Sequence, residues 1–148
     1  MRAATRLRAF LATLALPLVA ACVDLTGPST VIVDEGPDCR ARWVQRPSTT
    51  HAALTAWDCT TDDGTQSYVD YYELRVYHTT WVDFYMESYD FDAYLMLFDE
   101  WDVLVADDDD GGEATDSWLT VKLVPGTYYV GATSFRAGER GAYSLYIE

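Results

Sequence analysis

Hydrophobic and polar residues alternate with a period of two over most of the chain beyond about Ala52. In the clearest segment, 81–87, Val82, Phe84 and Met86 share one side, and aromatic or acidic residues share the other. Successive side chains of a strand point to opposite faces, so this pattern predicts half-buried β-strands. Four more segments alternate in the same way, over residues 68–77, 118–123, 127–133 and 142–147.

Turn signals separate these segments and point to the fold class. Residues 91–98 are apolar on both faces, which suits a central strand, and 103–106 predict a short strand after a turn at 99–102. Short strands at this spacing predict an all-β domain over 51–148, an antiparallel β-sandwich of jelly-roll-like form. The turn signals are Asp62-Asp63-Gly64, Gly111-Gly112, Pro125-Gly126 and Gly138–Gly141.

The first 22 residues have the pattern of an export signal. Arg2, Arg6 and Arg8 precede an apolar run of about 13 residues, too short to span a bilayer comfortably. The run ends in Leu-Val-Ala-Ala before Cys22, which resembles the lipobox of bacterial lipoproteins, although a chance cysteine after an ordinary signal is the alternative. We therefore expect a signal peptide over 1–21, a lipid on Cys22 and a tether and approach segment over 22–50.

Composition and charge limit the partners. The 148 residues are 49% hydrophobic and 14% aromatic, so a core can form. A formal net charge of −14 argues against nucleic acid, which needs clustered Lys and Arg, and against electrostatic attachment to anionic lipid headgroups. Membrane contact is expected through the lipid anchor only.

The cysteine count agrees with export. Once Cys22 carries lipid, Cys39 and Cys59 remain as a pair. An exported protein sits in an oxidising compartment, so the sequence predicts a Cys39–Cys59 disulfide. Two separate free thiols are the alternative.

Five segments follow one another in an informative order: Tyr68–Val76, Asp90–Leu95, Val103–Asp109, Pro125–Val130 and Gly141–Leu145. In this order they resemble the bacterial pre-peptidase C-terminal domain. The resemblance covers about residues 52–148 and implies a compact β-sandwich, often attached to secreted peptidases and mostly without a catalytic role of its own. This chain departs from the family pattern because a signal and a tether, rather than a peptidase, precede the domain.

Motifs of common enzyme classes are missing from the sequence. The only histidines are His51 and His78, and there is no Gly-x-Ser-x-Gly elbow, no His-Glu-x-x-His and no glycine-rich phosphate loop. Carboxylate pairs would arise by chance among 24 acidic residues. The sequence predicts a protein that is not an enzyme and requires no cofactor.

One acidic run is a candidate cation site. Asp107, Asp108, Asp109 and Asp110 are consecutive, and hard carboxylate oxygens suit Ca²⁺. A hairpin over residues 91–106 would bring this run back towards Asp90 and Asp92, which could complete the ligand set. The alternative is a solvated acidic hairpin loop.

A set of aromatic residues is a candidate ligand-binding surface. We expect these residues to lie on the outward faces of neighbouring strands, where such rings stack on sugars or dock a protein. Cross-strand aromatic pairing is the alternative. The set is Tyr71, Tyr77, Trp81 and Tyr85.

Together these patterns predict a non-catalytic binding or interaction module that a lipid anchor displays on the bacterial envelope. An envelope protein or a glycan is the expected ligand. Val23 rather than Asp follows Cys22. In envelopes where an acidic residue at that position retains lipoproteins at the inner membrane, the lipobox resemblance implies the outer membrane. The alternative is a secretion or stability accessory that acts with a separate secreted peptidase.

Overall fold

The computed structural model describes residues 39–148 apart from residue 63, and the described residues form ten strands. None of them lies in a helix long and apolar enough to cross a membrane. The predicted signal peptide, Cys22 and most of the tether lie outside the described residues. The strands are β1 (Arg42–Val44), β2 (Ser48–Leu54), β3 (Cys59–Thr60), β4 (Tyr68–Val76), β5 (Thr80–Glu87), β6 (Ala93–Asp99), β7 (Leu104–Asp108), β8 (Ser117–Leu123), β9 (Gly126–Ser134) and β10 (Gly141–Ile147).

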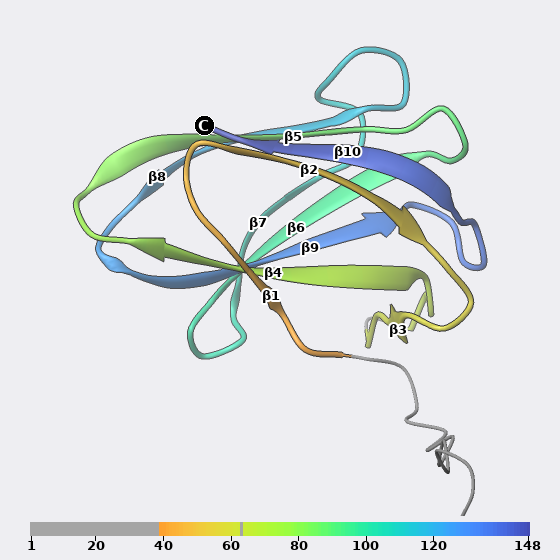
Figure 1. Cartoon of the computed structure of the whole chain (residues 1–148), viewed down its shortest axis with the longest axis horizontal. Helices are drawn as coiled ribbons and strands as arrows, with labels where there is room; N and C mark the ends of the chain where they lie inside the picture. The colour runs from red at the N-terminus through yellow and green to blue at the C-terminus, as the bar shows by residue number, and fades with distance from the viewer. Residues whose placement is uncertain (1–38, 63) are drawn as a thin grey trace, which may run out of the picture. The chain divides into compact units, whose positions relative to one another are not determined.

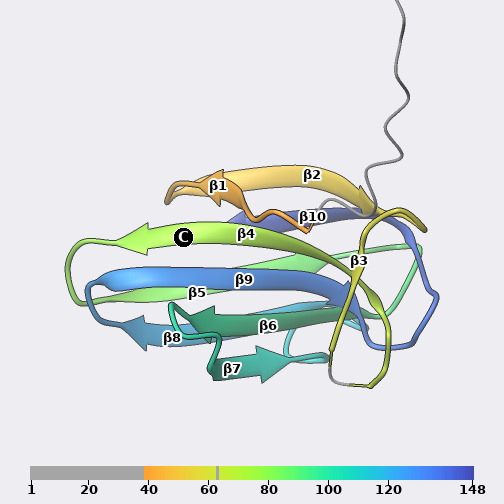
Figure 2. The same cartoon turned by 90° about the horizontal axis from the view of Figure 1, so that it is seen from below.

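The strands form two facing sheets, which makes the domain a β-sandwich (Figures 1 and 2). One sheet has the order β1-β4-β9-β6-β7, with β3 also pairing β4, and the other has the order β2-β10-β5-β8. Strands β4 to β10 alternate between the sheets at most connections, which gives the jelly-roll arrangement. The predicted antiparallel β-sandwich is confirmed: the strand pairs of the described residues are antiparallel apart from β1 with β4, which is parallel and lies at the edge of its sheet.

The core lies between the sheets, where the alternating pattern placed it. Val82, Phe84 and Met86 of β5 are fully buried, as are Tyr72 and Leu74 of β4. Each large apolar side chain taken out of water in this way stabilises the fold by roughly 1.5–3 kcal/mol. The opposite face of β5 is left to solvent, and it forms the candidate site.

The sandwich begins earlier than residue 51. Strand β2 pairs with β10 along its full length, from Ser48 opposite Ile147 to Leu54 opposite Gly141, and β1 pairs with β4. Residues 42–50 therefore belong to the domain rather than to an approach segment. The sequence pattern was weak here because β2 is an edge strand that begins with four polar residues, 48–51.

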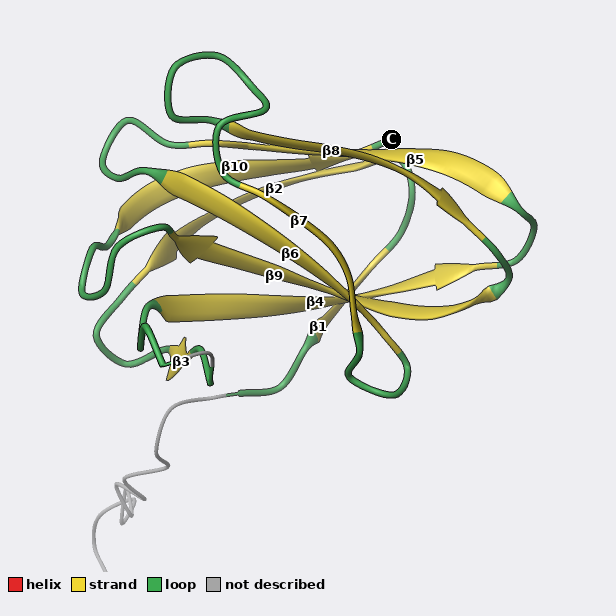
Figure 3. Ribbon diagram, turned by 180° about the vertical axis from the view of Figure 1, so that it is seen from behind, coloured by secondary structure: helices red, strands yellow, loops and turns green. Residues whose placement is uncertain are grey.

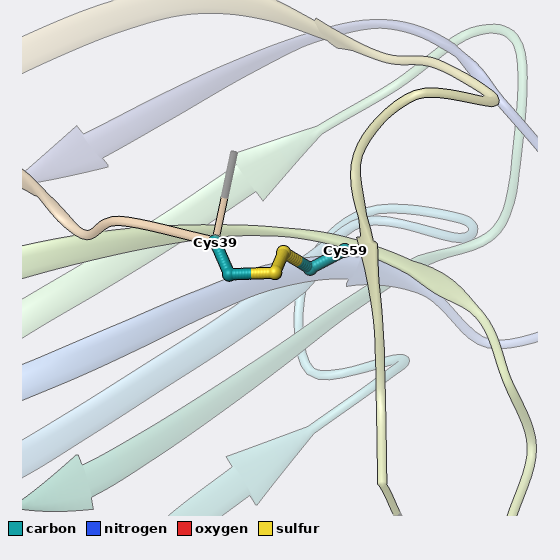
Figure 4. Close-up of a disulfide and its surroundings, with 2 residues drawn as sticks. All are labelled: Cys39 and Cys59. Carbon is teal, nitrogen blue, oxygen red and sulfur yellow. A yellow bond between two sulfur atoms is a disulfide. The ribbon is translucent and has the colours of Figure 1, made fainter. Parts of the chain in front are cut away.

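The predicted disulfide is confirmed. Cys39 and Cys59 are bonded, with their Cα atoms 5.3 Å apart, and the bond joins the segment before β1 to strand β3 (Figure 4). Such a bond is typical of exported proteins.

Candidate functional site

Three aromatic side chains lie in one row across the outer face of the β2-β10-β5-β8 sheet. Tyr85 on β5 is in register with Tyr146 on β10 and with Trp118 on β8. The rings of Tyr85 and Tyr146 are 5.8 Å apart and tilted by 40°, and Trp118 is 50% exposed. This aromatic row offers apolar ring surface to a ligand at the centre of the face.

Carboxylates flank the aromatic row on both sides. On one side Asp83 and Glu148 are direct neighbours, joined by two backbone hydrogen bonds of 2.9 Å. On the other side Glu87 follows Tyr85 by two positions on β5, and its Oε1 accepts a hydrogen bond of 2.8 Å from the Tyr146 hydroxyl. The row is thus bordered by negative charge along both edges.

The loop between β7 and β8 forms a wall of this site. It stands out beyond the β10-β5-β8 face, at the top of Figure 1 and again in Figure 3. The hollow between the loop and the sheet has a volume of about 590 Å³, and we call it the acidic aromatic groove. It is lined by Asp83, Tyr85, Glu87, Gly111, Gly112, Glu113, Trp118, Tyr146 and Glu148.

Asp108 holds the loop in place. Its Oδ2 accepts hydrogen bonds of 2.8 Å from the backbone N–H groups of Gly111 and Trp118. A side chain at Gly111 would meet the Asp108 carboxylate at 2.7 Å, so only glycine allows this approach. The wall of the groove is therefore built by one carboxylate and one glycine.

The tyrosine hydroxyls of the groove are held as hydrogen-bond donors. The Tyr85 hydroxyl donates to Oδ2 of Asp116, and this hydrogen bond, followed by burial, raises the pKa of Tyr85. The hydrogen bond to Glu87 likewise raises the pKa of Tyr146. Both rings therefore remain neutral at physiological pH.

No cation of the described residues is paired with these carboxylates. The four ion pairs within residues 39–148 use acids elsewhere in the fold. Lys122 of β8 lies on the same sheet face but opposite Trp81, beyond the row that contains Asp83 and Thr120. The groove is accordingly a site of unbalanced negative charge.

The predicted aromatic set is split between different surfaces. Tyr85 and Trp81 do share the outer face of β5, but Tyr71 lies on the other sheet, packed with Val69 and Met96, and Tyr77 lies beyond the end of β4. The prediction of one row was wrong because β4 and β5 are consecutive strands that belong to opposite sheets rather than to one hairpin.

Sequence reasoning missed Trp118, Tyr146 and Glu148 as site residues. The alternating pattern of their strands already placed Trp118 outward. The alternating pattern does not contain the strand order β10-β5-β8. That order brings these residues beside Tyr85 although they are distant in sequence.

The predicted calcium ligands are separated by other structural roles. The β6–β7 hairpin forms as expected, with Leu95 opposite Asp108. However, Asp90 accepts the backbone N–H of Ala142, and Asp107 accepts the hydroxyl of Tyr94. Across residues 39–148, residue 63 apart, no three acidic, histidine or cysteine side chains are grouped so that they could hold a metal ion.

Asp92 and Asp109, two further members of that set, have other partners: Asp92 lies 4.0 Å from Arg136, and Asp109 accepts a backbone hydrogen bond. Burial, with the nearby charge of Asp110, raises the pKa of Asp92. The carboxylate of Asp109 accepts the backbone N–H of Asp110. The loop is closer to the acidic hairpin that the sequence offered as the alternative, with Asp108 as its structural pin.

A second cluster of tyrosine and carboxylate is built on two buried tyrosines, Tyr72 and Tyr143, and we call it the arginine cluster. The Tyr143 hydroxyl donates to Asp70, and it also bonds the hydroxyl of Tyr72 across the two sheets at 2.5 Å. Arg42 completes the cluster, 2.6 Å from Asp70 Oδ1 and 5.0 Å from the centre of the Tyr72 ring.

Burial sets the electrostatics of the arginine cluster. It raises the pKa of Asp70 and, more strongly, that of Tyr143. Tyr143 therefore acts as a neutral donor to the carboxylate of Asp70, whose charge is balanced by Arg42, while Tyr72 bonds the Tyr143 hydroxyl.

His51 and Ser144 form a surface pair next to the groove, with Nδ1 and Oγ 3.1 Å apart. In a catalytic triad the acid orients the histidine, but here Glu87 lies in register with Ser144, on the side away from His51. The order of the three groups is therefore wrong for a serine nucleophile.

The fold is shared with two proteins of known structure. One is the pre-peptidase C-terminal domain of collagenase from Bacillus anthracis, at a TM-score of 0.59 and 18% identity, covering 74% of this chain and 96% of that one. The other is PliG, a periplasmic lysozyme inhibitor of g-type lysozyme from Aeromonas hydrophila, at a TM-score of 0.52 and 15% identity over the same shares. No protein-family model and no curated protein sequence matches the chain. At these identities the likeness is one of fold, and it is the fold that the sequence resemblance implied.

Proposed function

We propose that this protein is a non-catalytic binding module that acts through the acidic aromatic groove and is displayed on the bacterial envelope by a lipid on Cys22. The observation that carries the proposal is the row of Trp118, Tyr85 and Tyr146, in register on three strands and set in a hollow. Rings arranged in this way give a ligand a large rigid contact at little entropic cost.

The two structural neighbours support a binding role for this fold. One is named as a domain of a collagenase, and the other is named as an inhibitor that acts on another protein. The collagenase domain also favours a second candidate, a secretion or stability accessory that acts with a separate secreted peptidase. The groove favours binding over that role because an accessory domain does not require an open aromatic surface.

Export and anchoring are the second part of the proposal. The Cys39–Cys59 disulfide supports an exported chain. A lipid on Cys22 would hold the chain at the envelope, more specifically at the outer membrane, as expected when Val23 follows the lipidated cysteine. Replacing Cys22 by Ser should release the protein from the membrane fraction, whereas a mature Cys22→Ser protein that stays membrane-bound would contradict lipid anchoring.

Site-specific photo-crosslinking of the full chain in its envelope tests the binding role. A photoreactive phenylalanine analogue replaces Trp118 in the groove, and in a matched variant it replaces Trp101, a 72% exposed tryptophan in the β6–β7 turn. We expect a discrete crosslinked species from position 118 only. No species at 118, or the same species from both positions, would contradict binding at the groove.

A further inference from the structure

We propose that the acidic aromatic groove binds an arginine side chain of a basic partner protein, with the guanidinium stacked on the aromatic row and paired with the flanking carboxylates. The inference rests on the proposed function and names the chemistry of the ligand. Three independent features of the described residues lead to it.

The first feature is charge complementarity. Asp83 and Glu148 lie side by side on one edge of the row, Glu87 lies on the other edge, and Glu113 approaches from the loop. Like charges directly opposite one another on neighbouring strands are destabilising. Their concentration around one hollow, with every ion pair of the described residues located elsewhere, leaves a place that a cation would neutralise.

The second feature is the aromatic surface itself. The faces of tryptophan and tyrosine rings attract cations through their quadrupole, tryptophan most strongly. Trp118 is half exposed at one end of the row. A planar guanidinium is weakly hydrated, stacks on such rings and pairs with carboxylates in a bidentate manner, which makes arginine a better fit than lysine.

The third feature is a precedent within the same molecule. In the arginine cluster, Arg42 lies over the ring of Tyr72 and pairs with Asp70, while Tyr143 donates its hydroxyl to the same carboxylate. The groove repeats the tyrosine-to-carboxylate hydrogen bonds, from Tyr85 to Asp116 and from Tyr146 to Glu87, but its own residues supply no arginine. The groove is thus the arginine cluster without its cation.

A neutral glycan fits these observations less well. It would stack on the aromatic row but would gain little from the surrounding carboxylates, whose mutual repulsion would persist. An anionic glycan would be repelled by them. An arginine side chain uses both the rings and the charges.

Calorimetric titration of the full-length protein in neutral detergent tests the proposal. The probe is an acetylated, amidated hexapeptide of alternating arginine and glycine, and its neutral counterpart has citrulline at each arginine. We expect the arginine peptide alone to bind, and its affinity to fall between about 0.05 M and about 0.3 M salt because screening weakens the charge attraction. Cellohexaose serves as the neutral glycan probe and should not bind.

Matched variants locate the binding on the groove. Trp118→Ala should weaken binding about fivefold and Glu148→Gln about threefold, the range expected for one ring face or one partly exposed charge pair. Trp101→Ala and Glu100→Gln make the same chemical changes on the exposed β6–β7 turn and should leave affinity unchanged.

The outcomes separate the two proposals. Equal affinity for the arginine and citrulline peptides, binding of cellohexaose in place of the arginine peptide, or equal losses in the control variants would overturn the arginine inference. If crosslinking at position 118 still captures a partner in those cases, the binding role of the groove stands without it. Absence of peptide binding together with absence of crosslinking would overturn both.

Discussion

The arginine cluster and the acidic aromatic groove use the same side-chain chemistry in opposite surroundings. Both join tyrosine hydroxyls to carboxylates by hydrogen bonds. The tyrosines of the cluster lie between the sheets, where Tyr72 is 1% exposed, and Arg42 closes the cluster from the solvent side with its side chain 54% exposed. The groove lies on the outer face of one sheet, beside solvent, and residues 39–148 that the structure describes give it no cation.

Burial explains the difference. Asp70 is 14% exposed and lies against buried tyrosines, where the effective dielectric is lower than in water, so its charge is stabilised by a cation that reaches it from the solvent side. On the outer face water stabilises the charges, and the chain can keep several acids together at a small cost. Removing the cation of the arginine cluster should therefore lower the free energy of unfolding. In the groove, which has no cation from the described residues, the acids are available to a ligand.

The largest effect is expected from the disulfide that precedes Arg42. Replacing both Cys39 and Cys59 by Ala frees a loop with a sequence separation of 20 residues, which should cost about 3 kcal/mol and lower the melting temperature by roughly 10 °C. Thermal unfolding of the wild type with and without reductant, beside the double variant, measures this. The reductant should not affect the double variant, and a wild type unaffected by reduction would contradict a stabilising role for the bond.

The next effect tests the cation of the cluster directly. Arg42→Met removes the partner of Asp70, whose side chain is 14% exposed. Because the Arg42 side chain is itself 54% exposed, solvent screens the pair, and the free energy of unfolding should fall by about 1 kcal/mol. Arg75→Met is the matched control, because Arg75 pairs with Glu73 at the surface of the same sheet and its loss should cost less than about 0.5 kcal/mol. Equal losses in urea unfolding would mean that burial does not distinguish the two ion pairs.

Strands with one face in the core could be predicted from the sequence, and particular strands show why. The alternation of Val82, Phe84 and Met86 reports which face of β5 is apolar, and all three are fully buried. The start of strand β2 fell outside the predicted domain, which began at residue 51, because an edge strand with Ser48 to His51 at its start has no apolar alternation to detect. The alternating pattern therefore identifies a strand only where one of its faces packs against the core.

The site depended on information that local pattern does not contain. Tyr85 was predicted to point outward. Its neighbours Trp118 and Tyr146, however, lie 33 and 61 residues further along the chain and come beside it only through the strand pairing. Arg42 was not recognised because its role depends on reaching Asp70 from a parallel strand pair. Asp108 was recognised, but for a different role. The sequence suggested it as a cation ligand, whereas its carboxylate holds the loop that forms the wall of the groove.

The third test concerns pH and the carboxylate of the cluster. Burial raises the pKa of Asp70 above 3.8, so the folded protein retains this proton at pH values where the unfolded chain has lost it. This contribution to stability is fully present below pH 3.8 and is lost as the pH rises through the raised pKa. Urea unfolding of the wild type and of Asp70→Asn should therefore show a stability difference that shifts in favour of the variant as the pH increases across this window. The change should be smaller than the loss in Arg42→Met, and a difference that is independent of pH would contradict the assignment.

The smallest effect has the opposite sign and concerns the groove. Glu148 lies directly across from Asp83, and like charges in that position repel. Glu148→Gln removes the repulsion and, with no ion pair to lose, should raise the free energy of unfolding by about 0.5 kcal/mol at low salt. Because screening weakens the same repulsion in the wild type, the gain should disappear at high salt.

Glu100→Gln in the β6–β7 turn controls for the change in net charge alone. A loss of stability in Glu148→Gln would contradict this prediction. It would mean that the Glu148 carboxylate already has a stabilising partner within the fold, as Asp70 has in the arginine cluster, and that it is not available to a ligand.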